Sequence, residues 1–413
     1  MGKFGTCENP TTMRTLSVMR SAVFLVYLSA GALSAQNQAS EAPSLSSGFS
    51  RGTSLSSLVS GSGKSDKGLE LTLGLSSLYD SNLTQRPDGG ESDWILTPEI
   101  AAEYQVGNSR WNLGARGKLS YDSYQQRDDF DDASYLLDFY GGYQSKKLDA
   151  SFTTGISSTS GINRLAAGFI EQSSFKNSLE ANYRFSRKTS LNVNWDQRLT
   201  ESQTEGYGDT SSETAAFSAL WQATPLISIG PGFRYGLRTG NDDEEFTVMG
   251  PTLRLDYKLS TKIKLQSTIG IDYSDSPYSS DETLLNWSLG LNYRASSLWG
   301  FDLESIQDTR ATLSTGGGFD EISSFRLNYW RKVRRARIEL GVAYEDRSAT
   351  DSQLSLIVPR DFEYLTLSAA MSLPVFRDRA DLKIHVKWRD QDGADEDSSW
   401  DGVQTGFSLT WRF

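Results

Sequence analysis

The sequence predicts an all-β protein: a transmembrane antiparallel up-and-down β-barrel of about 18 strands, with short periplasmic turns and longer external loops. Three observations predict this fold. From Gly68 to the last residue, nearly every segment alternates apolar and polar residues with a period of two, as a strand with one apolar face does. The number of such segments is even, and their connections alternate between short and long. After the N-terminal region, no apolar run approaches the about 18 residues of a membrane-spanning helix.

The N-terminal region predicts export. Residues 13–20 carry two basic side chains, Arg14 and Arg20, residues 21–33 (SAVFLVYLSAGAL) are mostly apolar, and small residues follow at Ser34 and Ala35. This order is typical of a secretory signal peptide, which we place at residues 1–35; a buried core helix is the alternative. Residues 36–67 are rich in Ser and Gly and predict a disordered leader. The leader contains GSGKS, but Leu58 stands where a phosphate-binding loop needs its first Gly.

Charge and cysteine content exclude several classes of protein. The 413 residues include 41 Lys and Arg and 52 Asp and Glu, a net charge of −11. A chain this acidic does not suit general nucleic-acid binding, so no nucleic acid is expected as a partner. The one cysteine, Cys7, lies in the predicted signal peptide, so the mature chain has no disulfide.

The predicted barrel occupies residues 68–413. Short connections such as GNS and SKK follow the even-numbered strands, and long polar ones such as NLTQRPDGGES follow the odd-numbered strands. We expect the 18 strands to begin near residues 68, 93, 110, 133, 148, 173, 189, 211, 226, 245, 262, 283, 300, 319, 335, 361, 379 and 400.

The polar faces of these strands carry many charged side chains, and these charges decide whether the polar faces point to the lipid or to the interior. On a lipid face, each Lys or Arg near the bilayer midplane would cost roughly 2–4 kcal/mol, whereas a water-filled lumen solvates it. The apolar faces, with aromatic residues near strand ends, match a lipid belt with interfacial girdles. A soluble propeller or repeat sandwich is the alternative fold. The predicted lumen-lining basic residues are Arg116, Lys118, Arg198, Arg234, Arg238, Arg254, Lys258, Lys264, Arg326, Lys383, His385 and Arg389.

The first hairpin and the last strand carry a resemblance to known families. Tyr79-Asp80-Ser81-Asn82, followed by an acidic loop and DWILTP, resembles the beta-barrel porin 2 family, which implies an outer-membrane barrel of Gram-negative-type bacteria. Some relatives lie beside polysaccharide-export systems. From the residues alone, local side-chain-to-backbone turns explain YDSN better than a ligand site does. The C-terminal row resembles the outer-membrane assembly signal, which implies recognition by the barrel-assembly machinery; it consists of Phe407, Leu409, Trp411 and Phe413.

The chemistry-bearing residues do not predict an enzyme, a cofactor or a metal site. His385 is the only histidine, so a Ser/His hydrolase would need a serine and a carboxylate or amide beside it. A lumen-lining imidazole among Lys383, Lys387 and Arg389 is the simpler interpretation.

Two further segments suggest roles. Residues 159–172 form the predicted third external loop, and by analogy with porins they are a candidate constriction, with Arg164 and Glu171 as its charged residues. RKVRRAR, residues 331–337, falls at a predicted periplasmic turn, where contact with phospholipid headgroups is expected.

Together these observations predict a porin-like channel in the bacterial outer membrane that passes small hydrophilic solutes. An excess of basic inward positions favours anions, unless those charges pair across strands with carboxylates such as Asp256, Asp272, Glu304 and Glu339. An exit pore for exopolysaccharide export and a structural or adhesive surface barrel are the alternatives. Outer-membrane lipids are expected partners in each case.

Overall fold

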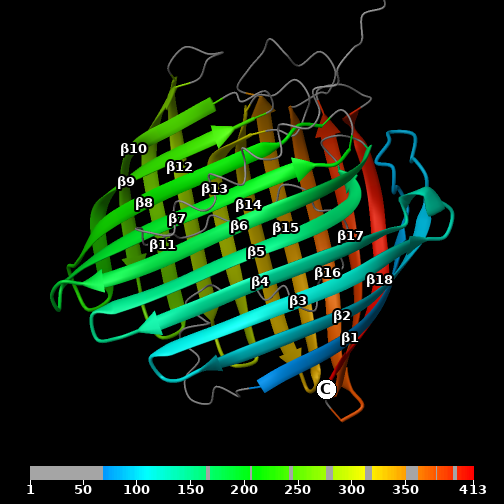
Figure 1. Cartoon of the computed structure of the whole chain (residues 1–413), viewed down its shortest axis with the longest axis horizontal. Coiled ribbons are helices and arrows are strands. Elements are labelled where there is room, and N and C mark those ends of the chain that lie inside the picture. Colours follow the sequence, from blue (N-terminus) through cyan, green and yellow to red (C-terminus); the bar gives the residue numbers. More distant parts are fainter. Residues whose placement is uncertain are drawn as a thin grey trace, which may run out of the picture.

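The wall of the molecule is one closed antiparallel sheet of 18 strands, and Figure 1 shows these strands arranged as a barrel. The structure, a computed structural model, describes residues 68–163, 168–204, 207–240, 245–275, 282–311, 319–349, 361–377, 379–393 and 398–413. The predicted fold class, an up-and-down barrel of 18 strands, is confirmed. The predicted signal peptide and leader lie outside the described residues.

Every strand is 13 to 17 residues long, and the only described helix is a short 3₁₀ turn, η1 (Asp128–Phe130). No helix among the described residues is long and apolar enough to cross a bilayer. The strands are β1 (Gly68–Asp80), β2 (Asp93–Gly107), β3 (Trp111–Tyr124), β4 (Asp132–Gln144), β5 (Leu148–Asn163), β6 (Gly168–Arg184), β7 (Thr189–Ser202), β8 (Thr210–Gln222), β9 (Ile227–Thr239), β10 (Glu245–Tyr257), β11 (Ile263–Asp275), β12 (Glu282–Arg294), β13 (Trp299–Ala311), β14 (Phe319–Val333), β15 (Ala336–Ala349), β16 (Phe362–Val375), β17 (Ala380–Gly393) and β18 (Trp400–Arg412).

The barrel closes where the last strand pairs with the first. Each strand pairs with its sequence neighbour, and β1 also pairs with β18, from Thr72 opposite Arg412 to Asp80 opposite Gln404. Because the strand number is even, β1 begins and β18 ends at the same rim, the one with the short turns (Figure 1). Closure leaves no unpaired sheet edge, which is what a bilayer requires of a spanning sheet.

The predicted strand starts agree with the structure to within one residue, except for the sixth strand. That strand begins at Gly168 rather than near residue 173, because the β5–β6 ladder continues through Ser160 opposite Glu171 to Asn163 opposite Gly168. The predicted boundaries of the third external loop, residues 159–172, are therefore wrong. The polar residues of this hairpin hide the period of two, but their backbone groups still pair.

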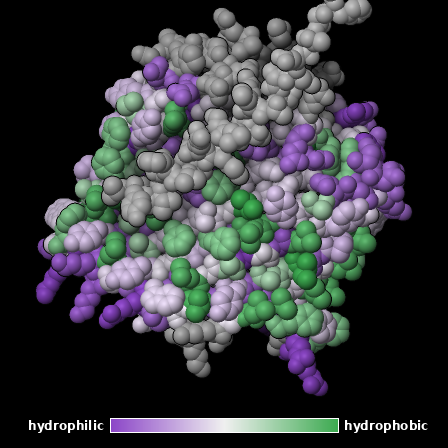
Figure 2. All heavy atoms as spheres, viewed as in Figure 1, coloured by the Kyte–Doolittle hydropathy of each residue, from purple (hydrophilic) through white to green (hydrophobic). Residues whose placement is uncertain are grey.

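The two faces of the sheet differ as predicted. In β1, Leu69, Leu71, Leu73 and Leu75 point outward with 41–60% of their surface exposed, whereas the alternate residues from Thr72 to Asp80 point inward and are at most 6% exposed, apart from Gly74. Figure 2 shows the result on one side of the barrel: hydrophobic side chains gather over the strands, and hydrophilic side chains gather at the rims. The outer face is therefore an apolar belt.

Candidate functional site

Four charged side chains form ion pairs in the interior of the barrel, between β9 and the strands β11 and β13. Arg234 and Arg238 point inward from β9, Asp272 from β11 and Asp308 from β13. Arg238 Nη2 lies 3.1 Å from Asp308 Oδ1, Arg234 Nη1 lies 3.2 Å from Asp272 Oδ2, and Arg234 also pairs with Asp308. We call these four residues the ionic belt.

The ionic belt marks a narrow section, because β9 and β13 are not neighbours in the sheet. Three strands, β10, β11 and β12, separate them in the wall. Nevertheless, Cα atoms of β13 lie within 8 Å of Cα atoms of both β8 and β9. The wall therefore folds toward itself here, and the ion pairs join its two sides across the interior.

The sequence of β9 makes room for this arrangement. Arg234, Gly236 and Arg238 follow one another on the inner face. A Cβ atom on Gly236 would lie 2.8 Å from Arg238 Nη1 and 2.8 Å from Val248 Cγ2, so a side chain there would displace the arginine. Glycine at this position lets two arginines from one strand reach the same carboxylate.

The belt is largely removed from solvent in the structure. The Arg238 side chain is 3% exposed, and the Asp308 side chain is 18% exposed. A charge buried to this extent is stable only when it is paired, and removal of one partner leaves the other charge uncompensated. Each charged side chain of the belt therefore needs its partners to remain stable in the buried position.

A second contact across the interior joins β10 to β7. Arg254 on β10 donates to Asn192 Oδ1 on β7 at 2.7 Å, and its Nε atom lies 3.2 Å from Asp256 Oδ1. Strands β7 and β10 are also non-neighbours. Polar side chains thus span the interior at more than one place.

Most of the predicted lumen-lining bases have a carboxylate partner, which the interpretation as cross-strand pairs anticipates. Lys118 lies 2.8 Å from Glu99, and Arg389 lies 2.6 Å from Asp80. Eight of the predicted basic residues form ion pairs: Arg116, Lys118, Arg234, Arg238, Arg254, Arg326, Lys383 and Arg389.

The other predicted residues are placed as follows. Arg198 lies opposite Lys176 on the β6–β7 pair, and Lys258 and Lys264 lie at the turn ends of β10 and β11. His385 lies on the inner face of β17 opposite Ala370, and Gly406 packs beside its ring. Among the described residues, no group of His, Cys, Asp and Glu has the geometry to hold a metal ion.

The predicted constriction residues and the C-terminal row are also placed. Glu171 is exposed on β6, and its backbone N–H donates to Thr204 Oγ1 at 2.9 Å; Arg164 lies outside the described residues. In the C-terminal row, Phe407, Leu409 and Trp411 lie on the outer face of β18, and Phe413 follows the end of that strand and is 67% exposed.

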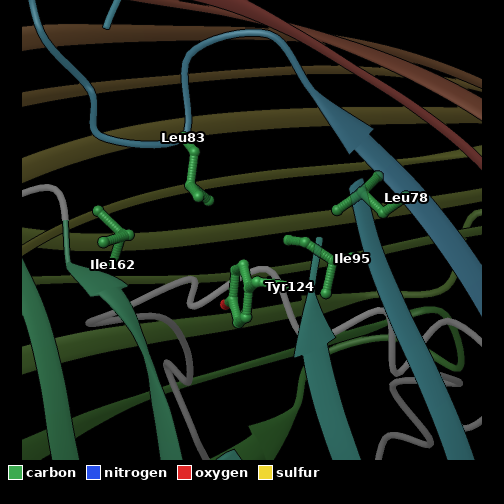
Figure 3. Close-up of a cluster of buried hydrophobic side chains, with 5 residues drawn as sticks. All are labelled: Leu78, Leu83, Ile95, Tyr124 and Ile162. Atoms are coloured by element: carbon green, nitrogen blue, oxygen red, sulfur yellow. The ribbon is translucent and has the colours of Figure 1, made fainter. Parts of the chain in front are cut away.

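Part of the first external connection, between β1 and β2, enters the barrel mouth. Leu83, in that connection, is 1% exposed and packs with four inward-facing residues of the wall (Figure 3). Those residues are Leu78, Ile95, Tyr124 and Ile162. This apolar cluster anchors the connection over one side of the mouth.

The YDSN segment fastens the barrel seam. Arg389 on β17 and Gln404 on β18 both donate to the Asp80 carboxylate, at 2.6 and 2.8 Å. Asn82 N donates to Asp80 Oδ1 at 3.1 Å, and Asn82 Nδ2 donates to the Asp401 carbonyl oxygen at 2.8 Å. The predicted local turn is confirmed, and the same residues tie β1 to β17 and β18. We call Asp80, Arg389 and Gln404 the seam network.

Sequence reasoning did not single out Asp308 as a member of the candidate site. Its inward direction follows from the alternation along β13, but its partners on β9 lie in the wall beyond three intervening strands. No local signal gives that contact, because it depends on the cross-section of the barrel.

Comparisons with known proteins add little beyond the fold. No family model matches the chain, and no curated protein matches it. Among solved structures, the FrpB iron transporter of Neisseria meningitidis (F3-3 variant) is 8% identical, with 84% of this chain and 81% of that chain covered and a TM-score of 0.45. OccAB3 of Acinetobacter baumannii is 11% identical, with 85% and 100% covered and a TM-score of 0.43. The outer membrane protein OpdK of Pseudomonas aeruginosa is 9% identical, with 84% and 99% covered and a TM-score of 0.43. Similarities at this level support no conclusion about function.

Proposed function

We propose that the protein is an outer-membrane channel for small hydrophilic solutes, and that the ionic belt is its charged narrow section. The observation that carries this proposal is the belt itself: charged side chains cross the interior of a closed barrel whose outside is apolar. A porin of the beta-barrel porin 2 type, with export by a signal peptide, fits the same proposal.

The outer face supports a membrane location. Leucine, isoleucine, phenylalanine, tyrosine and tryptophan side chains are exposed all around the barrel. A soluble monomer rarely exposes a continuous apolar patch of more than a few hundred Å². A bilayer removes this surface from water, and a closed antiparallel barrel is the strand architecture that crosses one. The outward C-terminal row supports the barrel-assembly machinery as a partner.

The inner face supports passage of polar solutes. Ion pairs and polar side chains from many strands point inward, and a water-filled interior tolerates them at little cost. Because eight of the predicted bases are paired, we propose a mild preference for anions that depends on the balance of charges in the belt, rather than a uniformly positive wall. The chain is not proposed to be an enzyme.

The test is the conductance of the refolded mature protein in planar bilayers, together with swelling of liposomes in sugars of increasing size. We expect steady single-channel currents and swelling that stops above a size limit. Folding is checked separately by the change in gel mobility on heating. A folded protein that gives neither current nor swelling would contradict the channel proposal. The exopolysaccharide exit pore and the structural or adhesive surface barrel would then be the remaining candidates.

A further inference from the structure

The rim that carries the short turns is basic. The described residues of these turns include no Asp or Glu, and the one acidic residue of the turn sequences, Asp378, lies outside the described residues. The exposed bases at this rim are Arg110, Lys146, Lys147, Arg187, Lys188, Lys258, Lys262, Arg331, Lys332, Arg334, Arg335, Arg377 and Arg379. The long connections, in contrast, are acidic. The rim with the turns therefore suits an anionic surface.

The bases are densest at two adjacent turns, which we call the arginine turns: residues 331–335, at the β14–β15 turn, and residues 376–379, at the β16–β17 turn. They are adjacent because β15 pairs with β16, with Arg337 opposite Ser372 near this rim. Asp378, in the second of these turns, lies outside the described residues and is not part of the proposed site. Arg331, Arg334, Arg377 and Arg379 are exposed and form no ion pair with a carboxylate of the described residues. Four guanidinium groups are thus available to a partner.

Apolar side chains stand beside these arginines. Val333 is 44% exposed and Phe376 is 61% exposed. The Phe376 ring lies 5.1 Å from the Trp411 ring, which lies 6.3 Å from the Phe413 ring. Cations next to exposed apolar and aromatic groups are typical of the boundary between lipid headgroups and acyl chains. An acidic protein surface would match the charge but not the exposed apolar groups.

The backbone of the arginine turns adds an independent observation. Among the described residues, four that are not glycine have a positive φ, and three of them lie here: Arg334 (55°), Phe376 (49°) and Arg377 (57°). The left-handed conformation disfavours residues with a Cβ atom and favours Gly. Arginine and phenylalanine therefore stand at positions where the backbone conformation favours glycine.

We infer that the arginine turns bind the headgroups of anionic phospholipids in the leaflet at this rim. The guanidinium groups of Arg334 and Arg377 would bind phosphate oxygens in pairs, and Val333 and Phe376 would pack against the adjoining acyl chains. This binding does not depend on whether the barrel conducts.

The test measures lipid binding to the refolded mature protein in a neutral detergent. The protein is titrated with phosphatidylglycerol or with phosphatidylcholine, and bound lipids are counted by native mass spectrometry. The variant Arg334→Ala/Arg377→Ala should bind phosphatidylglycerol about 25-fold more weakly, at roughly fivefold for each base removed. Its binding of phosphatidylcholine should not change. The matched control, Lys146→Ala/Lys147→Ala, removes two exposed charges from the β4–β5 turn and should keep the wild-type affinity.

A second variant separates lipid binding from folding. Arg334→Gly removes the side chain and also relieves the positive φ, so it should raise the melting temperature in neutral detergent while weakening phosphatidylglycerol binding. The inference is overturned if the double variant binds phosphatidylglycerol like the wild type, or if the lysine control loses as much affinity.

Discussion

Two buried arginine–aspartate networks in this barrel have the same chemistry but different positions in the wall. The seam network joins β1, β17 and β18, strands that the β1–β18 and β17–β18 ladders already hold together. The ionic belt joins β9 to β13, which share no ladder and meet only across the interior. One network therefore strengthens the wall, and the other crosses the interior, where the proposed channel would run.

Burial separates the two networks only in part. The Arg389 and Asp80 side chains of the seam are 5% and 1% exposed, and the Arg238 and Asp272 side chains of the belt are equally buried, whereas Arg234 and Asp308 are 13% and 18% exposed. Loss of Asp80 leaves Arg389 buried without a carboxylate, whereas loss of Asp308 leaves the partly exposed Arg234 with a second carboxylate, Asp272. The comparison predicts that seam variants lose stability first and that belt variants change conduction first.

The largest loss of stability is expected for Asp80→Ala. The variant leaves Arg389 buried without its carboxylate, and it also removes the acceptor for Gln404 and for the Asn82 N–H. The free energy of unfolding should fall by about 3–5 kcal/mol. Urea unfolding of the barrel in lipid vesicles, followed by tryptophan fluorescence, measures it. Glu70→Ala is the control, because its pair with Arg412 is exposed at 4.0 Å and should be worth less than about 1 kcal/mol. Equal losses of stability in the two variants would contradict the claim that the seam network stabilises the barrel more than an exposed ion pair does.

A smaller and more local loss is expected for Leu83→Ala. The substitution leaves a cavity in the apolar cluster of Figure 3 and should cost about 2–3 kcal/mol of local stability. Because β1 and β2 keep their ladder, amide exchange should accelerate in residues 81–92 and remain slow in the strands. Uniform acceleration throughout the barrel would show that the cluster supports the whole wall.

The belt should be less sensitive than the seam. Asp308→Ala removes the partner of two arginines, but Arg234 keeps Asp272 at 3.2 Å. We expect a loss of about 1–3 kcal/mol in the same urea experiment. A loss as large as that of Asp80→Ala would show that the belt is mainly structural.

The smallest effect is expected outside the membrane. Arg127 donates from Nε and Nη2 to the two carboxylate oxygens of Asp129, at 2.8 and 2.7 Å, and these bonds hold the pKa of Asp129 below its ordinary value. A carboxyl whose pKa is lowered by folding stabilises the folded form above its unfolded pKa, and the contribution is lost as pH falls through the folded pKa. The η1 turn should therefore loosen only in acid. An NMR titration of Asp129 tests this, and Arg127→Gln should return its pKa toward the ordinary value; an unchanged pKa would contradict the assignment.

The sequence was sufficient to predict the strands, because the period of two repeats in almost every segment and is locally encoded. It failed at β6, where Ser, Gln and Glu face both sides of the hairpin and leave no alternation to follow. The seam turn could be predicted from Asp80 and Asn82, whose side chains bond to nearby backbone. A lone leucine in a polar connection, Leu83, was an available signal for the inward connection.

The ionic belt could be predicted only in part. Alternation places Arg234, Arg238 and Asp272 on the inner face, and the sequence marked them as inward charges. The contact with Asp308 joins opposite sides of the wall, and it follows from how the barrel is flattened rather than from any residue pattern. Side-chain direction is a local property, whereas pairing across an interior is a property of the closed shape.

The most direct test of the central claim, that ions pass the belt and not the seam, is the reversal potential of single channels in a KCl gradient. Asp308→Asn should shift the potential toward anion selectivity, Arg234→Gln should shift it toward cation selectivity, and Asp80→Asn should leave it unchanged in the channels that insert. Identical reversal potentials in all three variants and the wild type would contradict the claim that the belt lies on the conduction path.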